Sequence, residues 1–375
     1  MPASAAAPAP RKNAIIAAAD LPEFQAQLLG WFAQSKRDLD WRATQDPYRV
    51  WISEIMLQQT RVAAVVPYYR RFLERFPTVG DLAAAREDAV LRHWAGLGYY
   101  SRARNLHRAA KEIVARHGGE FPSRLEDALA LPGIGGYTAA AVLSIAYGAP
   151  HAVLDGNVAR VLARLGAIRG DLRRPKRWRE LSAAADAPLP PAKENPGDWN
   201  QAMMELGATV CTPRAPRCDA CPVSRWCRAH ALGVALRLPS PRPKPKPVRL
   251  ALSAAVLLDP RGRTLLVRQQ SGHSALFSNL WQFPAVQSTK PAPERLDAYL
   301  RSEFGITAAL APLPRARHTV TFRRILLAPF LVRVPKLPLG VPGARTLRLA
   351  EIGRLPISSA TKKIAASVQA LPKSS

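Results

Sequence analysis

The sequence has 375 residues, which is room for two ordinary domains that each bury a core of their own. Its 54 lysines and arginines outnumber 27 aspartates and glutamates, so the formal net charge is +27 and the pI is near 11.0. This excess indicates a polyanionic partner, with nucleic acid favoured over a membrane. No apolar run reaches the roughly 20 residues that span a bilayer, and we expect no membrane association.

The first 20 residues are rich in alanine and proline and lack an apolar signal core, which predicts a disordered tail over residues 1–20. Helical patterns then follow one another with short connections, for example at 24–32, 89–94 and 103–117. We therefore predict an all-α domain over residues 21–236.

A helix is predicted to begin at Pro47, with Asp46 as its N-cap, and to continue unbroken until Pro67. Its decapeptide WISEIMLQQT, residues 51–60, is apolar on nearly every face, which is typical of a core helix. Glu54 lies in the middle. Burial raises the pKa of a carboxyl group, and a general acid is made to work near neutral pH in this way. A buried glutamate held by an arginine or a capping bond is the alternative.

Residues 94–106, WAGLGYYSRARNL, place two tyrosines behind Gly-Leu-Gly and ahead of Arg102 and Arg104. Aromatic rings stack on bases and arginines bind phosphates, so this segment is a candidate for contact with nucleic acid. The spacing is equally compatible with tyrosines packed in a helical core.

Residues 131–139, LPGIGGYTA, lie between two helical patterns. The Pro-Gly-x-Gly-Gly run predicts a tight hairpin whose backbone amides, at the start of the next helix, can hold a phosphate without reading sequence. We interpret Gly133 and Gly135 as DNA-binding positions. The alternative is an ordinary glycine-rich connection between helices.

Asp155 lies in LDGNVARVL, residues 154–162, just before a helix predicted to begin near Asn157. Alone, it reads as a helix cap. Paired with Glu54, it suits cleavage of a glycosidic bond: one acid protonates the leaving group, and one carboxylate stabilises the developing oxocarbenium ion. We favour the pair.

All four cysteines fall within 17 residues, spaced C-x6-C-x2-C-x5-C: Cys211, Cys218, Cys221 and Cys227. This clustering indicates a metal site in a reducing compartment rather than disulfides. Four thiolates can enclose a zinc ion or a cubane iron–sulfur cluster. Zinc sites usually use two close cysteine pairs and only one is present, so a [4Fe-4S] cluster is favoured, in a loop whose arginines face DNA backbone.

Residues 237–248, RLPSPRPKPKPV, alternate proline with basic residues and predict an extended linker. Beyond it lie three strand-like runs and a closing helical pattern: 250–258, 264–267, 324–334 and 358–371. They predict a smaller α/β domain over residues 249–375.

The hairpin, the LDGN aspartate and the cysteine spacing resemble the endonuclease III superfamily of DNA repair glycosylases, which are all-α helix-hairpin-helix proteins with an iron–sulfur loop. Within it, SEIMLQQT, GLGYYSRARNL, LPGIGGYTA and NQAMMELGA resemble the adenine DNA glycosylase family of the MutY type. The resemblance runs from about Leu21 to the C-terminus and is most specific up to Cys227. It implies base-excision repair of double-stranded DNA: adenine mispaired with 8-oxoguanine or guanine is rotated out of the stack, and its N-glycosidic bond is hydrolysed to leave an abasic site. We also expect a monomer that works on nucleoid DNA in a bacterial cytoplasm.

Carried over by position, the resemblance implies that Glu54 protonates adenine N7 and that Asp155 stabilises the sugar cation, electrostatically or through a transient covalent bond. Asn157 positions the water or Asp155. Tyr137 stands where lyase members carry a Schiff-base lysine, so strong lyase activity is not expected. The implied substrate-binding positions are Trp41, Arg42, Leu57 and Glu205 in the adenine pocket, Gln59 and Tyr99 as wedges in the duplex, and Gln58 beside them.

The C-terminal domain resembles the Nudix-like lesion-recognition domain of the same family. Its segment 298–305, AYLRSEFG, keeps only Glu303 of the glutamates that would bind magnesium, so nucleotide hydrolysis is not expected. Where the family has Phe-Ser-His, this chain has Val320, Thr321 and Phe322, so Thr321 supplies the hydroxyl while the histidine is lost. Two other hypotheses stay open: a bifunctional glycosylase/lyase for damaged pyrimidines, and a non-catalytic iron–sulfur or zinc protein that senses DNA.

Overall fold

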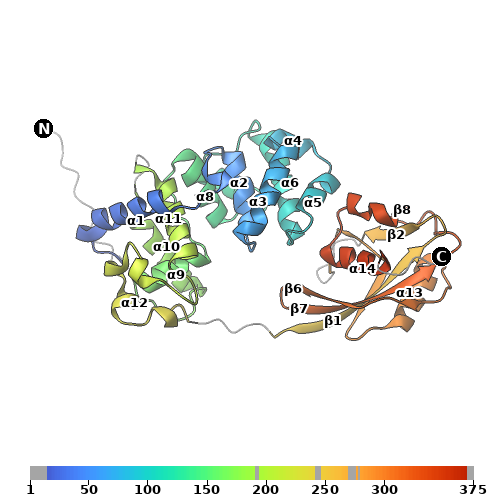
Figure 1. The fold of residues 1–375 in the computed structure, drawn as a ribbon. Helices are drawn as coiled ribbons and strands as arrows, with labels where there is room; N and C mark the ends of the chain where they lie inside the picture. The colour runs from blue at the N-terminus through green and yellow to red at the C-terminus, as the bar shows by residue number, and fades with distance from the viewer. Residues whose placement is uncertain (1–14, 191–193, 241–245, 269–275, 278, 370–375) are drawn as a thin grey trace. The chain divides into compact units, whose positions relative to one another are not determined.

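The computed structural model describes residues 15–190, 194–240, 246–268, 276–277 and 279–369. The chain divides into two compact units (Figure 1): a helical unit of residues 1–84 and 104–243, and a mixed unit of residues 85–103 and 244–375. The sequence pattern did not indicate that residues 85–103 group with the C-terminal part. Most of the predicted tail, residues 1–14, and part of the predicted linker, residues 241–245, lie outside the described residues.

The helical unit contains α1 (Leu21–Ser35), α2 (Pro47–Leu57), α3 (Val62–Arg75), α4 (Val79–Ala84), most of α6 (Tyr100–Arg116), α7 (Leu125–Ala130), α8 (Gly136–Tyr147), α9 (Gly156–Leu165), α10 (Pro175–Asp186), α11 (Pro196–Thr209) and α12 (Arg228–Ala231). Helices α1, α8, α9 and α11 pack around one hydrophobic core, to which Phe24, Val158, Leu162, Trp199 and Met203 belong. The predicted all-α character is confirmed. Ile16 joins this core and Ala18–Asp20 form a 3-10 turn, so ordered structure begins before Leu21.

Helix α2 begins as predicted, because Asp46 accepts a hydrogen bond from the backbone amide of Tyr48 at 2.8 Å and Pro47 opens the first turn. Its predicted continuation to Pro67 is wrong. The helix ends at Leu57, since Gln59 adopts a φ of 57° and turns the chain. Pro67 lies inside α3 instead.

Two glycines set the distance at which α11 packs on its neighbours. A Cβ atom at Gly197 would lie 2.7 Å from the carbonyl oxygen of Ser144 in α8. A Cβ atom at Gly207 would lie 2.8 Å from the Cβ of Asn157 in α9. Any side chain at either position would force the helices apart.

The mixed unit contains α5 (Glu87–Trp94), β1 (Val248–Leu258), β2 (Arg263–Arg268), β3 (Trp281–Gln282), β4 (Ala285–Ser288), α13 (Pro293–Phe304), β5 (Ala311–Pro312), β6 (Ala316–Val320), β7 (Arg323–Arg333), β8 (Ala344–Arg348) and α14 (Ser359–Gln369). One sheet has the order β4-β1-β7-β5, with β6 also paired to β7, and the other has the order β3-β2-β8. Strands β1 and β7 run parallel, and the other pairs are antiparallel.

The strand-like runs predicted at 250–258, 264–267 and 324–334 correspond to β1, β2 and β7 to within two residues, so the predicted α/β character is confirmed. The closing helix predicted at 358–371 corresponds to α14, and the last two residues of that range lie outside the described residues. Residues on one face of the first sheet pack with α14 and those on the other with α13. Across the described parts of the chain, no helix is long and apolar enough to cross a membrane.

Candidate active site

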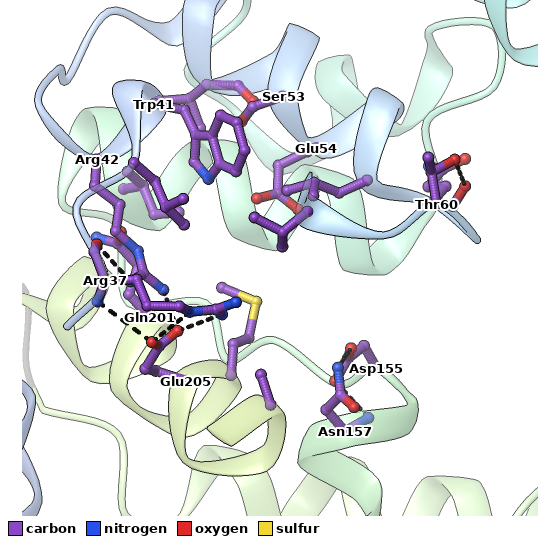
Figure 2. A pocket seen from close by; sticks show the side chains of 18 of the residues that line it. Arg37, Trp41, Arg42, Ser53, Glu54, Thr60, Asp155, Asn157, Gln201 and Glu205 are labelled. Atoms are coloured by element: carbon purple, nitrogen blue, oxygen red, sulfur yellow. Dashed lines mark hydrogen bonds and ion pairs between the residues drawn. The ribbon is translucent and has the colours of Figure 1, made fainter. Parts of the chain in front are cut away.

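A cavity of about 500 Å³ lies in the helical unit between α2, α8, α9, α11 and the segment that precedes α2 (Figure 2). It brings together most of the residues that the sequence nominated: Trp41, Arg42, Glu54, Leu57, Gln58, Gln59, Tyr137, Asp155, Asn157 and Glu205. Segments separated by more than a hundred residues therefore meet around a volume that is suited to one small organic group.

Glu54 projects from α2 into this cavity and is only 5% exposed. The Tyr137 hydroxyl on α8 donates a hydrogen bond to its Oε2 at 2.7 Å. Burial raises the pKa of Glu54 to about 7, and the charge of Asp155 adds to this, while the bond from Tyr137 and the charge of Arg42 oppose it. At neutral pH this carboxyl group thus exists in both protonation states.

Asp155 caps α9 from the other side of the cavity (Figure 2). Its Oδ1 accepts the backbone amides of Asn157 and Val158 at 2.9 and 2.7 Å, and its Oδ2 accepts the Asn157 side-chain amide at 3.0 Å. Burial raises the pKa of Asp155, whereas these three bonds favour the charged form. Asp155 is thus a helix cap, as the plain interpretation predicted, and it also lines the cavity.

Glu205 on α11 is fully buried and is held by two arginines. The Arg37 guanidinium donates two bonds to it, from Nε to Oε1 and from Nη2 to Oε2, each 2.7 Å long, and the Arg37 backbone amide donates to Oε1 at 3.3 Å. Arg42 Nη2 donates to Oε2 at 2.7 Å (Figure 2). Burial opposes ionisation of Glu205, but these bonds outweigh it and lower its pKa to about 2. This ion-pair network ties the segment that carries Trp41 to α11.

Ten of the described residues that line the cavity were not identified as site residues from the sequence, among them Arg37, Ser53, Gln201 and Met204. Gln201 and Met204 precede Glu205 by four residues and one residue on α11, so the helical period could have indicated Gln201. The Met204 sulfur lies 3.1 Å from the Tyr137 hydroxyl. Nothing in the sequence around Arg37 marks it as the partner of Glu205.

The loop between α7 and α8 has the predicted helix-hairpin-helix form. Gly133 adopts a φ of 78°, and a Cβ there would lie 2.6 Å from that of Asn105, so a larger residue does not fit. Gly135 is the N-cap of α8 and no side chain caps the amides that follow it. The exposed start of α8 thus presents backbone N–H groups to an anion. Arg104 lies partly buried on α6.

The four cysteines line one small cavity beneath α9 and are not joined by disulfides. Burial is the main cause that raises the pKa of Cys221 to about 12; the charges of the other three cysteines contribute in the same direction, and a backbone hydrogen bond at Val223 opposes them. Within the described ranges, no group of three or more His, Cys, Asp or Glu side chains could hold a metal ion as they stand. Four cysteine sulfurs around one cavity are a donor set that suits a thiolate-bound metal ion or cluster.

Two arginines of α9 hold the cysteine loop. Arg164 donates to the sulfur of Cys211 at 3.3 Å and to the carbonyl oxygens of Thr212 and Leu238 at 2.7 and 2.9 Å. Arg160 donates to the carbonyl oxygen of Cys211 at 2.9 Å and to the side-chain oxygen of Asn157 at 3.0 Å. One helix therefore contacts both the cavity and the cysteines.

The remaining predicted residues lie in the mixed unit. Tyr99 has a φ of 47° and is 40% exposed, with the Arg102 guanidinium 5.5 Å from its ring. Thr321 lies exposed in the turn between β6 and β7 with a φ of 54°, and its hydroxyl donates to the Val320 carbonyl oxygen at 2.7 Å. A positive φ is strained for a β-branched residue, so this turn is tightly determined.

Comparison with known proteins agrees with this geometry. Residues 52–185 match the family described as HhH-GPD superfamily base excision DNA repair protein. An adenine DNA glycosylase of Rattus norvegicus is 36% identical over 406 residues, covering 92% of this chain and 78% of its own length. One of Homo sapiens is 47% identical over 221 residues, covering 56% of this chain and 40% of its own length.

Among solved structures, a thermostable thymine-DNA glycosylase is similar to this chain with a TM-score of 0.52 and 29% identity, covering 57% of this chain and 98% of its own. It supports the fold of the helical unit. The rat relative extends over nearly the whole chain and thus includes most of the mixed unit. The chain therefore belongs to the adenine DNA glycosylase family and is a DNA glycosylase of base excision repair that removes adenine.

Proposed function

We propose that the substrate is adenine paired with 8-oxoguanine or guanine in duplex DNA, and that the adenine is rotated into the cavity between α2 and α9. One observation carries this proposal: Glu54, whose pKa is raised to about 7, faces the same cavity as Asp155, which three hydrogen bonds hold toward its charged form. An acid and a carboxylate in contrasting surroundings are what cleavage of a glycosidic bond requires.

In this mechanism Glu54 protonates N7 of adenine. The Tyr137 hydroxyl donates to Oε2, so the acidic proton resides on Oε1, which is left for the base. Protonation makes adenine a better leaving group, and positive charge develops on the sugar. Asp155 stabilises that cation from the other side of the cavity, and Asn157, bonded to Oδ2, keeps the carboxylate oriented and helps place the attacking water.

Trp41, Arg42, Leu57 and Glu205 are proposed to form the adenine pocket, with Gln58 at its edge, where its side-chain amide donates to Thr138 at 3.2 Å. The ion pairs of Glu205 hold Arg42 in place. The exposed Gln59 is proposed to wedge into the duplex next to the flipped nucleotide, with Tyr99 as a second wedge. Gly133, Gly135 and Arg104 are proposed to contact the DNA backbone.

We propose that the enzyme is monofunctional. Tyr137 carries a hydroxyl group where an imine-forming enzyme needs an amine, and no lysine is found among the described residues that line the cavity. Borohydride should therefore trap little covalent adduct with DNA, and strand breaks should appear only after heat or alkali. A robust adduct would favour a bifunctional enzyme instead.

Cys211, Cys218, Cys221 and Cys227 are proposed to hold a [4Fe-4S] cluster. When bound, it would supply structural cross-linking of the loop, whose shape Arg160 and Arg164 fix from α9. Iron and sulfide analysis together with a visible absorption spectrum tests this proposal, since zinc gives neither sulfide nor colour.

The mixed unit is proposed to be a Nudix-like domain that reads the base opposite adenine, with Thr321 offering its hydroxyl from the exposed turn. We propose that a single chain suffices, because one chain supplies every residue of the cavity described above, and that it works on nucleoid DNA in a bacterial cytoplasm.

The decisive experiment measures base release from duplexes that carry adenine opposite 8-oxoguanine, guanine, cytosine or thymine. We expect release opposite the first two only. Equal release opposite all four would remove the mispair proposal, and full release by Glu54→Gln would remove the general-acid assignment.

A further inference from the structure

Part of one sheet face in the mixed unit is not covered by its helix. Residues of β1 and β7 that share a face with α13 pack against it over the later half of both strands: Ala255, Leu257, Ala328 and Phe330. Ala292, the residue that precedes α13, is fixed to the middle of β1, because its backbone amide donates a hydrogen bond to the Ser253 hydroxyl at 3.0 Å. The earlier half of the same face forms a wall of a cavity of about 680 Å³.

This uncovered half carries three arginines from three adjacent strands. Arg249 of β1 is paired in register with Arg324 of β7. Arg324 is paired with Thr319 of β6, and Arg317, two residues before Thr319, lies on the same face. All three arginines are exposed. With Lys290 at the rim, these residues form what we call the basic face: Arg249, Lys290, Arg317 and Arg324.

The charges of the basic face are not balanced within the described part of the chain. None of its four cations forms an ion pair there, and none of the described residues that line the cavity is acidic. Like charges on neighbouring strands destabilise a sheet, so this arrangement costs folding free energy that a bound anion would offset. The floor between the arginines consists of the apolar side chains of Ala251 and Leu326.

We infer that the basic face binds the phosphate backbone of duplex DNA without regard to its bases. Arginines set in a row across strands match a run of phosphates, and guanidinium groups bind phosphate oxygens in pairs. A nucleoside triphosphate site would also need carboxylates to hold its magnesium, and the described lining offers none. The choice of DNA as the polyanion rests on the proposed function.

The test uses the full chain with three arginines replaced, R249Q/R317Q/R324Q. The matched control R295Q/R333Q/R348Q removes the same charge from three exposed arginines of the same unit that do not line this cavity. Binding to an undamaged duplex is measured by fluorescence anisotropy between 50 and 200 mM salt. Each lost phosphate contact reduces the magnitude of the slope of log K against log salt by about 0.9. The slope of R249Q/R317Q/R324Q, the face variant, should therefore be smaller in magnitude by about 2.7 than that of the unmodified chain.

The face variant should bind DNA more weakly than the unmodified chain, and this difference in affinity should shrink on the order of 40-fold between 50 and 200 mM salt. The control should lose less than one unit of slope. The variant R249K/R317K/R324K keeps the charge and should keep most of the slope, which guards against a face variant that does not fold.

Equal slopes for the face variant and the control would overturn the inference. So would displacement of the duplex by a millimolar deoxynucleoside triphosphate beyond the effect of equal ionic strength, since that would assign the face to a nucleotide. Adenine release at saturating enzyme reports separately on the proposed function. The control variant should retain the unmodified rate, and failure of the unmodified chain to release adenine would leave the slope comparison intact.

Discussion

Replacing Glu54 with glutamine should make the protein more stable and inactive at the same time. The folded protein raises the pKa of this carboxyl from 4.5 to about 7, chiefly by burial. Each pKa unit corresponds to about 1.4 kcal/mol, so ionising Glu54 in the folded state costs about 3 kcal/mol more than in the unfolded chain. Glutamine has nearly the same shape, cannot ionise and can still accept the Tyr137 hydroxyl.

The stability that Glu54→Gln gains should increase with pH. A raised carboxyl pKa means that the folded state holds its proton more tightly, so the unmodified protein loses stability as pH rises from about 4.5 to about 7. Glu54→Gln escapes this loss. Its advantage should be below about 1 kcal/mol at pH 5 and about 3 kcal/mol at pH 8.

Guanidinium unfolding followed by tryptophan fluorescence at both pH values measures this difference, and Glu74→Gln, an exposed carboxyl of the same unit, is the control. A gain that is the same at pH 5 and pH 8 would refute the burial argument. Adenine release by Glu54→Gln should fall by about 10²- to 10⁴-fold, the usual contribution of a general acid.

Three further predictions concern the same unit. Tyr137→Phe removes a hydrogen bond that lowers the pKa of Glu54, so the alkaline limb of the single-turnover pH profile, expected near pH 7, should move to higher pH; a shift to lower pH would contradict the geometry. Glu205→Gln breaks a buried ion pair and should cost on the order of 3 kcal/mol at pH 7 in guanidinium unfolding. Because the pKa of Glu205 is about 2, its contribution is complete above about pH 4.5 and lost as pH falls toward 2, so an equal cost at pH 3 would be inconsistent with this assignment. Cys218→Ser should lower iron content and visible absorbance together, and unchanged iron would exclude this thiol as a ligand.

The sequence predicted the elements that depend on local signals. Asp46 and Pro47 define the start of α2, Asp155 defines the start of α9, and the glycines of the hairpin define the turn before α8. Each of these signals acts within a few residues, so it can be recognised without knowing the tertiary structure.

The predictions that failed concern features that depend on residues distant in the sequence or on weak turn signals. Helix α2 ends at Leu57, and the residues that turn the chain there, Gln58 and Gln59, are neither proline nor glycine, so the end was placed ten residues too late, at Pro67. Arg37 was missed because its importance comes entirely from Glu205, 168 residues away. The grouping of residues 85–103 with the C-terminal unit also follows from tertiary contacts that periodicity cannot reveal.

The two glycines of α11 also influence the shape of the cavity. Gly197 fixes how near α11 comes to α8, which bears Tyr137, and Gly207 fixes how near it comes to α9, which follows Asp155. Neither glycine lines the cavity. The shape of the cavity is thus set partly by two positions that do not line it, and we expect an alanine at either to change that shape while every residue that lines the cavity stays the same.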